Sequence, residues 1–282
     1  MRKLSLPHTE LAVSRLGFGT SSLHHLLFAS QRHRLLCAAL DAGFTHFDTA
    51  PMYGEGMAER SLGAFASGTL RREVTLATKI GWPAETLSEL FPPALYAKRV
   101  VTGVANRIGL GPPSPRKRAL SASDAEASLA RSLRALRTDW IDVLFVHEPQ
   151  PAEIGALQEL APWLQRQKAS GRARWLGLSG VAASCVGVAR ELEGVFDILQ
   201  VEDSLAGHEA DVLRDLDWPL QVTYGYFRRA ARSASETQGS VPDGANVLAG
   251  ALNRNPAGMV LVSTRRPERL QAMARAAEQA PK

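Results

Sequence analysis

Short apolar runs alternate with longer amphipathic stretches along the chain. The short runs predict β-strands at residues 15–19, 45–49, 74–78, 141–147, 173–179, 198–202, 220–223 and 259–262. Apolar residues spaced three and four positions apart predict helices at residues 31–42, 57–66, 123–136, 152–170, 182–192, 208–216, 246–253 and 267–278. Repeated alternation of strand and helix indicates parallel strands joined by helical crossovers.

The predicted helix at residues 123–136 shows the pattern in detail. Leu129, Leu133 and Leu136 share one face of this helix. Ser123 is the expected N-cap, and Glu126, three residues later, would complete a capping box.

Eight strand–helix units in 282 residues predict a closed (β/α)8 TIM barrel. An open, doubly wound sheet is the alternative, but Gly17 and Gly19 are not followed by the third glycine of a dinucleotide-binding turn. Residues 3–6 and 11–13 flank Pro7 and His8, which predicts an N-terminal β-hairpin at the barrel floor. We expect one barrel domain over residues 1–282, with a long irregular loop at 81–120 on the active-site face.

Composition supports a globular protein, with 45% hydrophobic and 22% charged residues. No apolar run is long enough to span a membrane, and the first residues lack a signal-peptide pattern. The two cysteines, Cys37 and Cys185, match no disulfide framework or metal motif, so we expect a cytoplasmic protein without a metal site.

The net charge of +5 comes from one segment. Between Glu89 and Asp124 there is no acidic residue, but the segment contains Lys98, Arg99, Arg107, Arg116, Lys117 and Arg118. These cations lie in a region rich in proline and glycine, which predicts a solvated loop or a funnel for an anionic substrate or cofactor. Aromatic residues are not interleaved with them as in many nucleic-acid-binding surfaces, so no nucleic-acid partner is expected.

Polar residues stand at the carboxyl ends of several predicted strands, where barrel enzymes place their catalytic groups. Asp48, Lys79 and His147 each end or follow an apolar strand, and Tyr53 comes five residues after Asp48. Taken singly, Asp48 suits a turn cap and Lys79 a surface position. Because charged groups are rarely buried unless they are paired, their joint placement predicts that the four side chains converge.

Such a group of side chains suits the reduction of a carbonyl. A tyrosine with an ordinary pKa of about 10 is a proton donor at neutral pH. A nearby lysine stabilises the phenolate, an aspartate orients the lysine, and a histidine hydrogen-bonds the carbonyl oxygen. These roles predict proton delivery to an aldehyde or ketone that accepts a hydride.

The segments that carry these residues make the chain recognisable. Residues 43–63 surround Asp48 and Tyr53, residues 78–81 contain Lys79, and residues 132–149 contain His147. Together with residues 171–179 and 196–200, they resemble the signatures of the aldo/keto reductase family. The resemblance implies a TIM barrel and NADPH-dependent carbonyl reduction without metal, with Tyr53 as general acid beside Asp48, Lys79 and His147.

The resemblance also implies a cofactor site and a small-molecule carbonyl substrate. The cofactor NADP(H) is expected to contact Gly19, Thr20, Ser179, Gln200, Tyr224, Ser263, Thr264 and Arg269. Ser179 and Gln200 would hold the carboxamide, Tyr224 would stack on the nicotinamide, and the last three would grip the 2′-phosphate. Trp82 and His24 are candidate substrate-binding residues.

The sequence departs from the family pattern around this cofactor site. Gly180 stands where the family usually has an asparagine, Gly225 begins an unusual turn after Tyr224, and Ala272 and Met273 replace a Glu-Asn pair. Two other functions stay open, the first because of these departures and the second because the same catalytic groups serve both directions of the reaction. One is a weakly active nucleotide-binding barrel that serves as a sensor or scaffold, and the other is an NAD(P)-dependent sugar or alcohol dehydrogenase. The pattern does not predict an oligomeric state.

Overall fold

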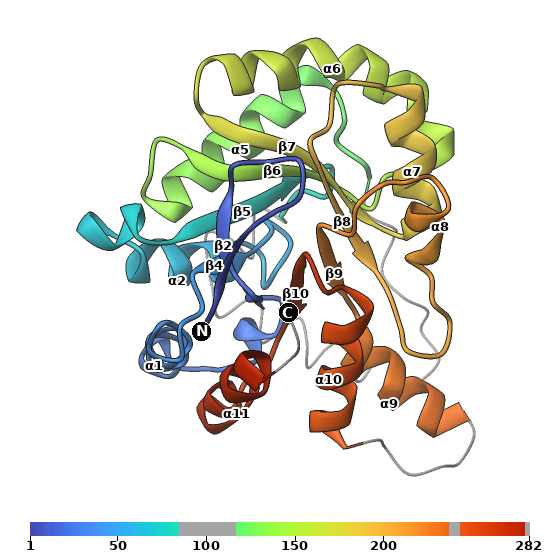
Figure 1. The fold of residues 1–282 in the computed structure, drawn as a ribbon. Helices are drawn as coiled ribbons and strands as arrows, with labels where there is room; N and C mark the ends of the chain where they lie inside the picture. Colours follow the sequence, from blue (N-terminus) through green and yellow to red (C-terminus); the bar gives the residue numbers. More distant parts are fainter. Residues whose placement is uncertain (85–116, 237–242, 280–282) are drawn as a thin grey trace, which may run out of the picture.

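The computed structural model describes residues 1–84, 117–236 and 243–279. In it, parallel strands close into a barrel with the order β10-β3-β4-β5-β6-β7-β8-β9 (Figure 1). The strands are β3 (Leu16–Gly19), β4 (His46–Asp48), β5 (Thr75–Ile80), β6 (Ile141–His147), β7 (Ala173–Gly180), β8 (Ile198–Glu202), β9 (Val222–Tyr224) and β10 (Met259–Val262). The eight predicted strands and the TIM-barrel architecture are confirmed.

The predicted N-terminal hairpin is also present. Strands β1 (Lys3–Ser5) and β2 (Ala12–Ser14) pair in antiparallel fashion. Leu6, Leu11 and Val13 pack in one cluster with barrel residues that include Val143 and Phe145. These apolar side chains explain the position of the hairpin, because they cover the lower end of the barrel interior.

The helices lie around the outside of the barrel, and α1 and α11 contact each other where the ring closes (Figure 1). Those that match the prediction are α1 (Ala29–Asp41), α2 (Met57–Phe65), α5 (Ala122–Leu136), α6 (Ile154–Ala169), α7 (Ala182–Glu191), α10 (Gly244–Arg254) and α11 (Pro267–Gln279). Short 3₁₀ turns at Leu23–His25, Gly68–Arg72 and Pro151–Glu153 complete the connections. No described helix combines the length and the apolarity needed to cross a bilayer.

Two helix predictions need correction, and one helix was missed. Helix α8 covers only Asp211–Arg214, because His208 and Asp217, on either side of it, take a left-handed φ of +53° that a helix cannot include. Helix α9 (Tyr226–Glu236) was not predicted, since only Tyr226 and Ala234 of it are buried. The N-cap of α5 is Ser121, whose Oγ accepts from Asp124 N at 3.1 Å, so the proposed Ser123 cap is wrong.

Side-chain alternation along the strands places the polar residues inside the barrel mouth. Ala77, Phe145 and Ile198 belong to the cluster that fills the barrel interior. Lys79, His147 and Gln200 follow them by two positions, and successive residues of a strand point to opposite faces, so these polar residues share the interior face. The core layer thus gives way to a polar layer at the carboxyl ends of the strands. Most of the predicted 81–120 loop, residues 85–116, lies outside the described residues.

Candidate active site

Asp48 and Lys79 form a buried ion pair at the ends of the neighbouring strands β4 and β5. The Nζ of Lys79 donates to Oδ1 of Asp48 at 2.5 Å and to the carbonyl oxygen of Thr49 at 2.9 Å. Their side chains are 2% and 1% exposed, respectively. Burial lowers the pKa of Lys79, and the charge of Asp48 opposes that shift. The pair therefore holds a desolvated cation directly beneath the barrel mouth.

Tyr53 lies above this pair, in the turn between β4 and α2. Its ring centroid is 5.2 Å from Nζ of Lys79. The turn depends on Gly54, which has a φ of +61° and whose added Cβ would lie 2.3 Å from Cβ of His24. Burial first, and then the charges of Asp48 and Glu148, raise the pKa of the Tyr53 phenol well above its usual value, and Arg228 opposes this shift only in part. The phenol is therefore protonated at neutral pH.

His147 ends β6 and meets the tyrosine edge to face. The two ring centroids are 6.0 Å apart, with an interplanar angle of 83°. Burial first, and then the charges of Lys79 and Arg118, lower the pKa of His147 to about 2. The imidazole is therefore neutral, and one of its nitrogens carries a hydrogen that it can donate.

Ser179 and Gln200 join the same layer from β7 and β8. Nε2 of Gln200 donates to Oγ of Ser179 at 3.1 Å and to Oδ1 of Asp48 at 3.2 Å. The Oε1 of Gln200 is buried and has no hydrogen-bond partner among the residues that the structure describes. Buried acceptors are normally paired, so this oxygen is suited to receive a hydrogen bond from a bound molecule.

Except for Lys79, which contacts the site through Asp48, these residues line a cavity of about 330 Å³ at the carboxyl end of the barrel. Its lining residues that we expected in the site are Gly19, Asp48, Tyr53, His147, Ser179, Gln200, Tyr224 and Ser263. The sequence reasoning missed the remaining ones: Ser21, Met52, Glu148, Gly225, Phe227, Arg228, Leu261 and Val262. Most of these are apolar or belong to turns, and only the position of Glu148 directly after His147 and the unusual turn that begins at Gly225 gave a signal. Among the described residues, no cluster of three or more histidines, cysteines or carboxylates could hold a metal ion.

The other expected site residues lie outside the lining of this cavity. Thr20 is buried, and its hydroxyl Oγ1 donates a hydrogen bond to the carbonyl oxygen of Asp48 at 3.0 Å. This bond holds the end of β4 in place. His24 packs against Gly54 and stands 4.3 Å from the His25 ring, measured between centroids. The Trp82 ring lies 4.6 Å from the Arg118 guanidinium.

The expected phosphate-binding residues begin at the end of β10. The Oγ of Ser263 lies 2.8 Å from Oγ of Ser22, which joins the ends of β10 and β3. Thr264 is buried and its Oγ1 accepts from Arg266 N at 3.2 Å, while Arg269 is exposed in the first turn of α11.

The backbone beside Gly180 approaches it closely. A Cβ at this position would lie 3.0 Å from Cα of Glu148 and 3.3 Å from Cδ of Pro149. Glu148 itself has a left-handed φ of +49° and donates its N–H to the Ser179 carbonyl oxygen at 2.6 Å. The sharp turn after β6 thus crowds the position that a side chain at Gly180 would take, and a larger residue there would have to displace this turn by a few tenths of an ångström.

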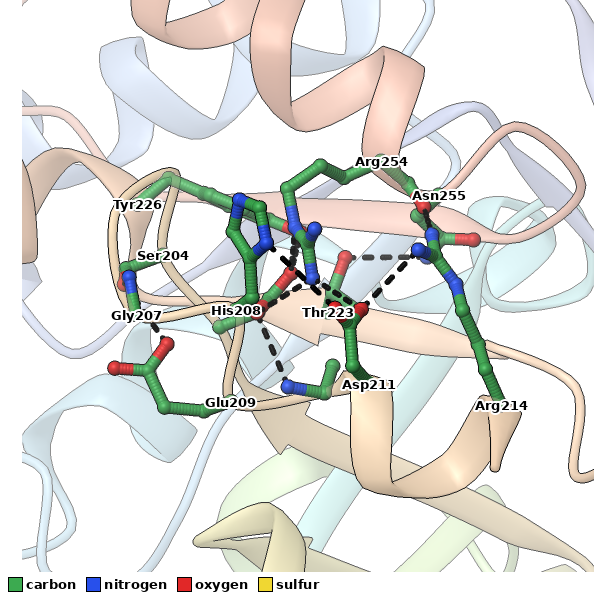
Figure 2. A network of polar contacts seen from close by, with 12 residues as sticks. Ser204, Gly207, His208, Glu209, Asp211, Arg214, Thr223, Tyr226, Arg254 and Asn255 are labelled. Carbon is green, nitrogen blue, oxygen red and sulfur yellow. Dashed lines mark hydrogen bonds and ion pairs between the residues drawn. The ribbon is translucent and has the colours of Figure 1, made fainter. Parts of the chain in front are cut away.

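One wall of the cavity is held from behind by Asp203, which is fully buried. Figure 2 shows its partners Tyr226 and Arg254. Its carboxylate accepts from Tyr226 Oη at 2.8 Å, from Arg254 Nε at 2.7 Å and from Ala210 N at 3.1 Å. Its N–H donates to the carbonyl oxygen of Tyr224 at 2.8 Å. Burial raises the pKa of Asp203, but these hydrogen bonds bring it below its usual value. The network fixes α9 and the Tyr224 turn, both of which face the cavity.

Comparison with known proteins agrees with this architecture. The model of the Aldo/keto reductase family matches residues 15–216. D-threo-aldose 1-dehydrogenase of a Pseudomonas species is 29% identical over 180 residues, covering 62% of this chain and 53% of that protein. The NADH-specific methylglyoxal reductase of Escherichia coli is 26% identical, covering 87% of this chain and 73% of that protein. The chain spans about half the length of the first curated relatives it matches.

Solved structures show the same fold. An aldo-keto reductase of Bacillus halodurans superposes with a TM-score of 0.74 at 19% identity, covering 100% of this chain and 92% of that one. A Klebsiella pneumoniae aldo-keto reductase in complex with NADPH gives a TM-score of 0.68 at 19% identity, with the same coverage. Because the family model covers most of the barrel, the chain belongs to the aldo/keto reductase family of oxidoreductases.

Proposed function

We propose that the protein reduces an aldehyde, ketone or sugar carbonyl to an alcohol with NADPH, and that Tyr53 is the general acid. The observation that carries the proposal is the buried Asp48–Lys79 pair beneath a phenol that lines the cavity. A desolvated ammonium next to a tyrosine stabilises the phenolate that remains after the proton has left. Neutral His147 donates its ring hydrogen to the carbonyl oxygen and orients the substrate toward Tyr53.

The residues present fit a nicotinamide group. Gln200 Oε1 offers a buried acceptor and Ser179 Oγ a neighbouring hydroxyl, which suits a carboxamide. Tyr224 lines the same cavity and offers an aromatic face. A bound nicotinamide cofactor supplies the hydride for the carbonyl carbon, while Tyr53 delivers the proton to the oxygen.

The preference for NADP is proposed from the residues that follow β10. Arg269 is exposed in the first turn of α11, and a planar guanidinium there suits a 2′-phosphate together with Ser263 and Thr264. The relatives differ in this property, since one is named as NADH-specific and another was solved with NADPH.

The substrate class is proposed from the rim of the cavity. Met52 and Phe227 supply apolar surface there, and Glu148 and Arg228 supply charge. A small polar carbonyl such as an aldose suits this mixture, and one relative is named as an aldose dehydrogenase. Oxidation of a sugar with NAD(P) is the second candidate, because the same groups accept the proton when the reaction runs backward. The buried Asp48–Lys79 pair argues against a sensor or scaffold, because a buried ion pair adds little stability and a protein without catalysis does not need one beside a phenol.

A direct test measures NADPH and NADH oxidation by the protein with a short aldehyde and with an aldose, next to the reverse reaction with the corresponding alcohol. We expect carbonyl-dependent oxidation that is faster with NADPH than with NADH. The variant Arg269→Ala should reduce this preference for NADPH and leave turnover with NADH unchanged. Absence of turnover with either cofactor in both directions would contradict the proposal.

A further inference from the structure

The side chain of Arg118 contacts the chain at two points, at the last residue of β6 and again a few residues after it. Its Nη1 donates to the carbonyl oxygen of His147 at 2.7 Å. Its Nε and Nη2 donate to the two carboxylate oxygens of Glu153 at 2.7 and 2.9 Å. The side chains of Arg118 and Glu153 are each 17% exposed, so this contact is largely shielded from water. A two-pronged guanidinium–carboxylate contact of this kind is strong and has a defined direction.

The two anchor points bracket the turn that forms the cavity rim. Glu148 lies between them and lines the cavity, with its backbone in the left-handed region at a φ of +49°. A non-glycine residue keeps this conformation only where its surroundings impose it. Arg118 is part of those surroundings, because it holds the residue before Glu148 and the carboxylate five residues after it.

Arg118 is also fixed to the end of β5, the strand that carries Lys79. Its guanidinium carbon lies 4.6 Å from the centre of the Trp82 ring. The N–H of Ala119 donates to the carbonyl oxygen of Gly81 at 3.0 Å. A Cβ on Gly81 would lie 3.0 Å from Nη1 of Arg118, so the guanidinium packs directly on this backbone. The side chain therefore links the two strand ends that bear Lys79 and His147.

We propose that Arg118 is a positioning residue of the active site, which sets the direction of the His147 imidazole and the place of Glu148 at the rim. The proposal rests on the function proposed above, in which His147 orients the carbonyl. It goes beyond that function because Arg118 lies outside the cavity lining and comes from the segment that precedes α5. Small displacements of an orienting group lower the rate of the chemical step far more than they lower binding.

The charge of Arg118 has a second effect on His147. A guanidinium close to a buried imidazole opposes its protonation, and Lys79 acts in the same sense. The other charged or titratable groups around this end of the cavity are Asp48, Tyr53, Glu148, Tyr224 and Arg228. Burial remains the main cause of the neutral imidazole, so removal of Arg118 alone should raise the pKa of His147 without making it cationic at neutral pH.

The test compares Arg118→Met with Arg172→Met in the full-length chain. Arg172 makes a similar two-pronged contact with Glu126, at 3.0 and 2.9 Å, but it precedes β7 at the opposite end of the barrel. Both variants should lower the Tm. Only Arg118→Met should lower kcat, by about 10- to 100-fold, with the Kd of NADPH changed by less than about twofold. The ring resonances of His147 in a histidine-selective NMR spectrum should shift in Arg118→Met alone.

The variant Arg118→Lys separates charge from geometry. It keeps the positive charge but cannot donate to both carboxylate oxygens of Glu153 in the same geometry, so its kcat should lie between those of the wild type and Arg118→Met. If Arg118→Met does not fold, Arg118→Lys is judged by the same kcat and NMR readouts. A wild-type kcat together with unshifted His147 resonances in the folded Arg118 variant would overturn the proposal. The NMR readout applies even if the wild type shows no carbonyl turnover, which would overturn only the proposed function.

Discussion

The amide nitrogen of Gln200 donates to the same Asp48 oxygen that accepts from Lys79. The residues expected to hold a cofactor and those expected to move a proton are thus joined in one buried network. Because Nε2 is occupied by Asp48 and by Ser179, the orientation of the amide is fixed and its Oε1 is left as the acceptor for a ligand.

Replacement of Gln200 by methionine should weaken cofactor binding. Loss of one buried hydrogen bond of about 1 kcal/mol raises the Kd of NADPH by roughly five- to tenfold. A fluorescence titration with NADPH measures this change. Gln221→Met is the matched control, because Gln221 is equally buried but bonds Pro7 and Asp197 near the barrel floor. An unchanged Kd in Gln200→Met, or an equal rise in the control, would argue against a carboxamide site at Gln200.

Two buried histidines predict how stability depends on pH. Burial and the charge of Lys79 lower the pKa of His46 to about 3, and that of His147 lies at about 2. In the unfolded chain both titrate near pH 6.5, so below that pH the unfolded state binds more protons. The stability that comes from keeping these two histidines neutral should be fully present above about pH 6.5. As the pH decreases below this value, the free energy of unfolding should fall by up to about 1.4 kcal/mol per pH unit for each histidine.

Urea unfolding between about pH 7.5 and 5.5 measures this loss. The variant His46→Gln removes one of the two titrating groups, so its stability should fall less steeply with acidification than that of the wild type. A free energy of unfolding that stays constant over this range would show that the histidines are not held neutral.

The Asp203 network should affect both stability and cofactor binding. Asp203→Asn removes a buried charge that faces Arg254 and should cost about 3 kcal/mol of unfolding free energy. It should also weaken NADPH binding, because Asp203 holds the Tyr224 turn and α9 against the cavity. Since the folded pKa of Asp203 is lowered, this contribution is present above about pH 3.9 and is lost as the pH falls through the folded pKa.

Asp142→Asn provides the comparison for this effect. Asp142 belongs to β6, is 1% exposed and is not among the residues that line the cavity. It forms ion pairs with Arg71 at 3.0 Å and with Arg174 at 3.2 Å. Its replacement should lower stability by a similar amount and leave the Kd of NADPH unchanged. If both variants bind NADPH as the wild type does, the network has no part in shaping the cofactor wall.

The sequence predicted the barrel and its polar layer because both follow from simple periodicities. A residue such as Lys79 or His147 that closes an apolar strand stands out from the pattern, and the barrel topology brings such strand ends together. Helix α9 gave no comparable signal, since Arg228, Arg229 and Arg232 leave it with few buried apolar side chains.

The contacts that shape the site depend on residues distant in sequence, and a local pattern does not contain them. Arg118 reaches Glu153, and Asp203 reaches Arg254, only because the closed barrel brings these connections together. The tight approach of Glu148 to Gly180 arises in the same way, from two neighbouring strand ends. Sequence reasoning therefore found the residues at the strand ends and missed the groups that hold them in place.

The role of Tyr53 as general acid is tested most directly by the single-turnover rate of NADPH oxidation by a carbonyl substrate in Tyr53→Phe at saturating cofactor. The ring and its packing beside Lys79 are retained in this variant, so NADPH should bind with the wild-type Kd. The rate should fall by about 10²- to 10⁴-fold, as expected for loss of a general acid. A rate equal to that of the wild type would show that the proton comes from another group and would contradict the assignment of Tyr53.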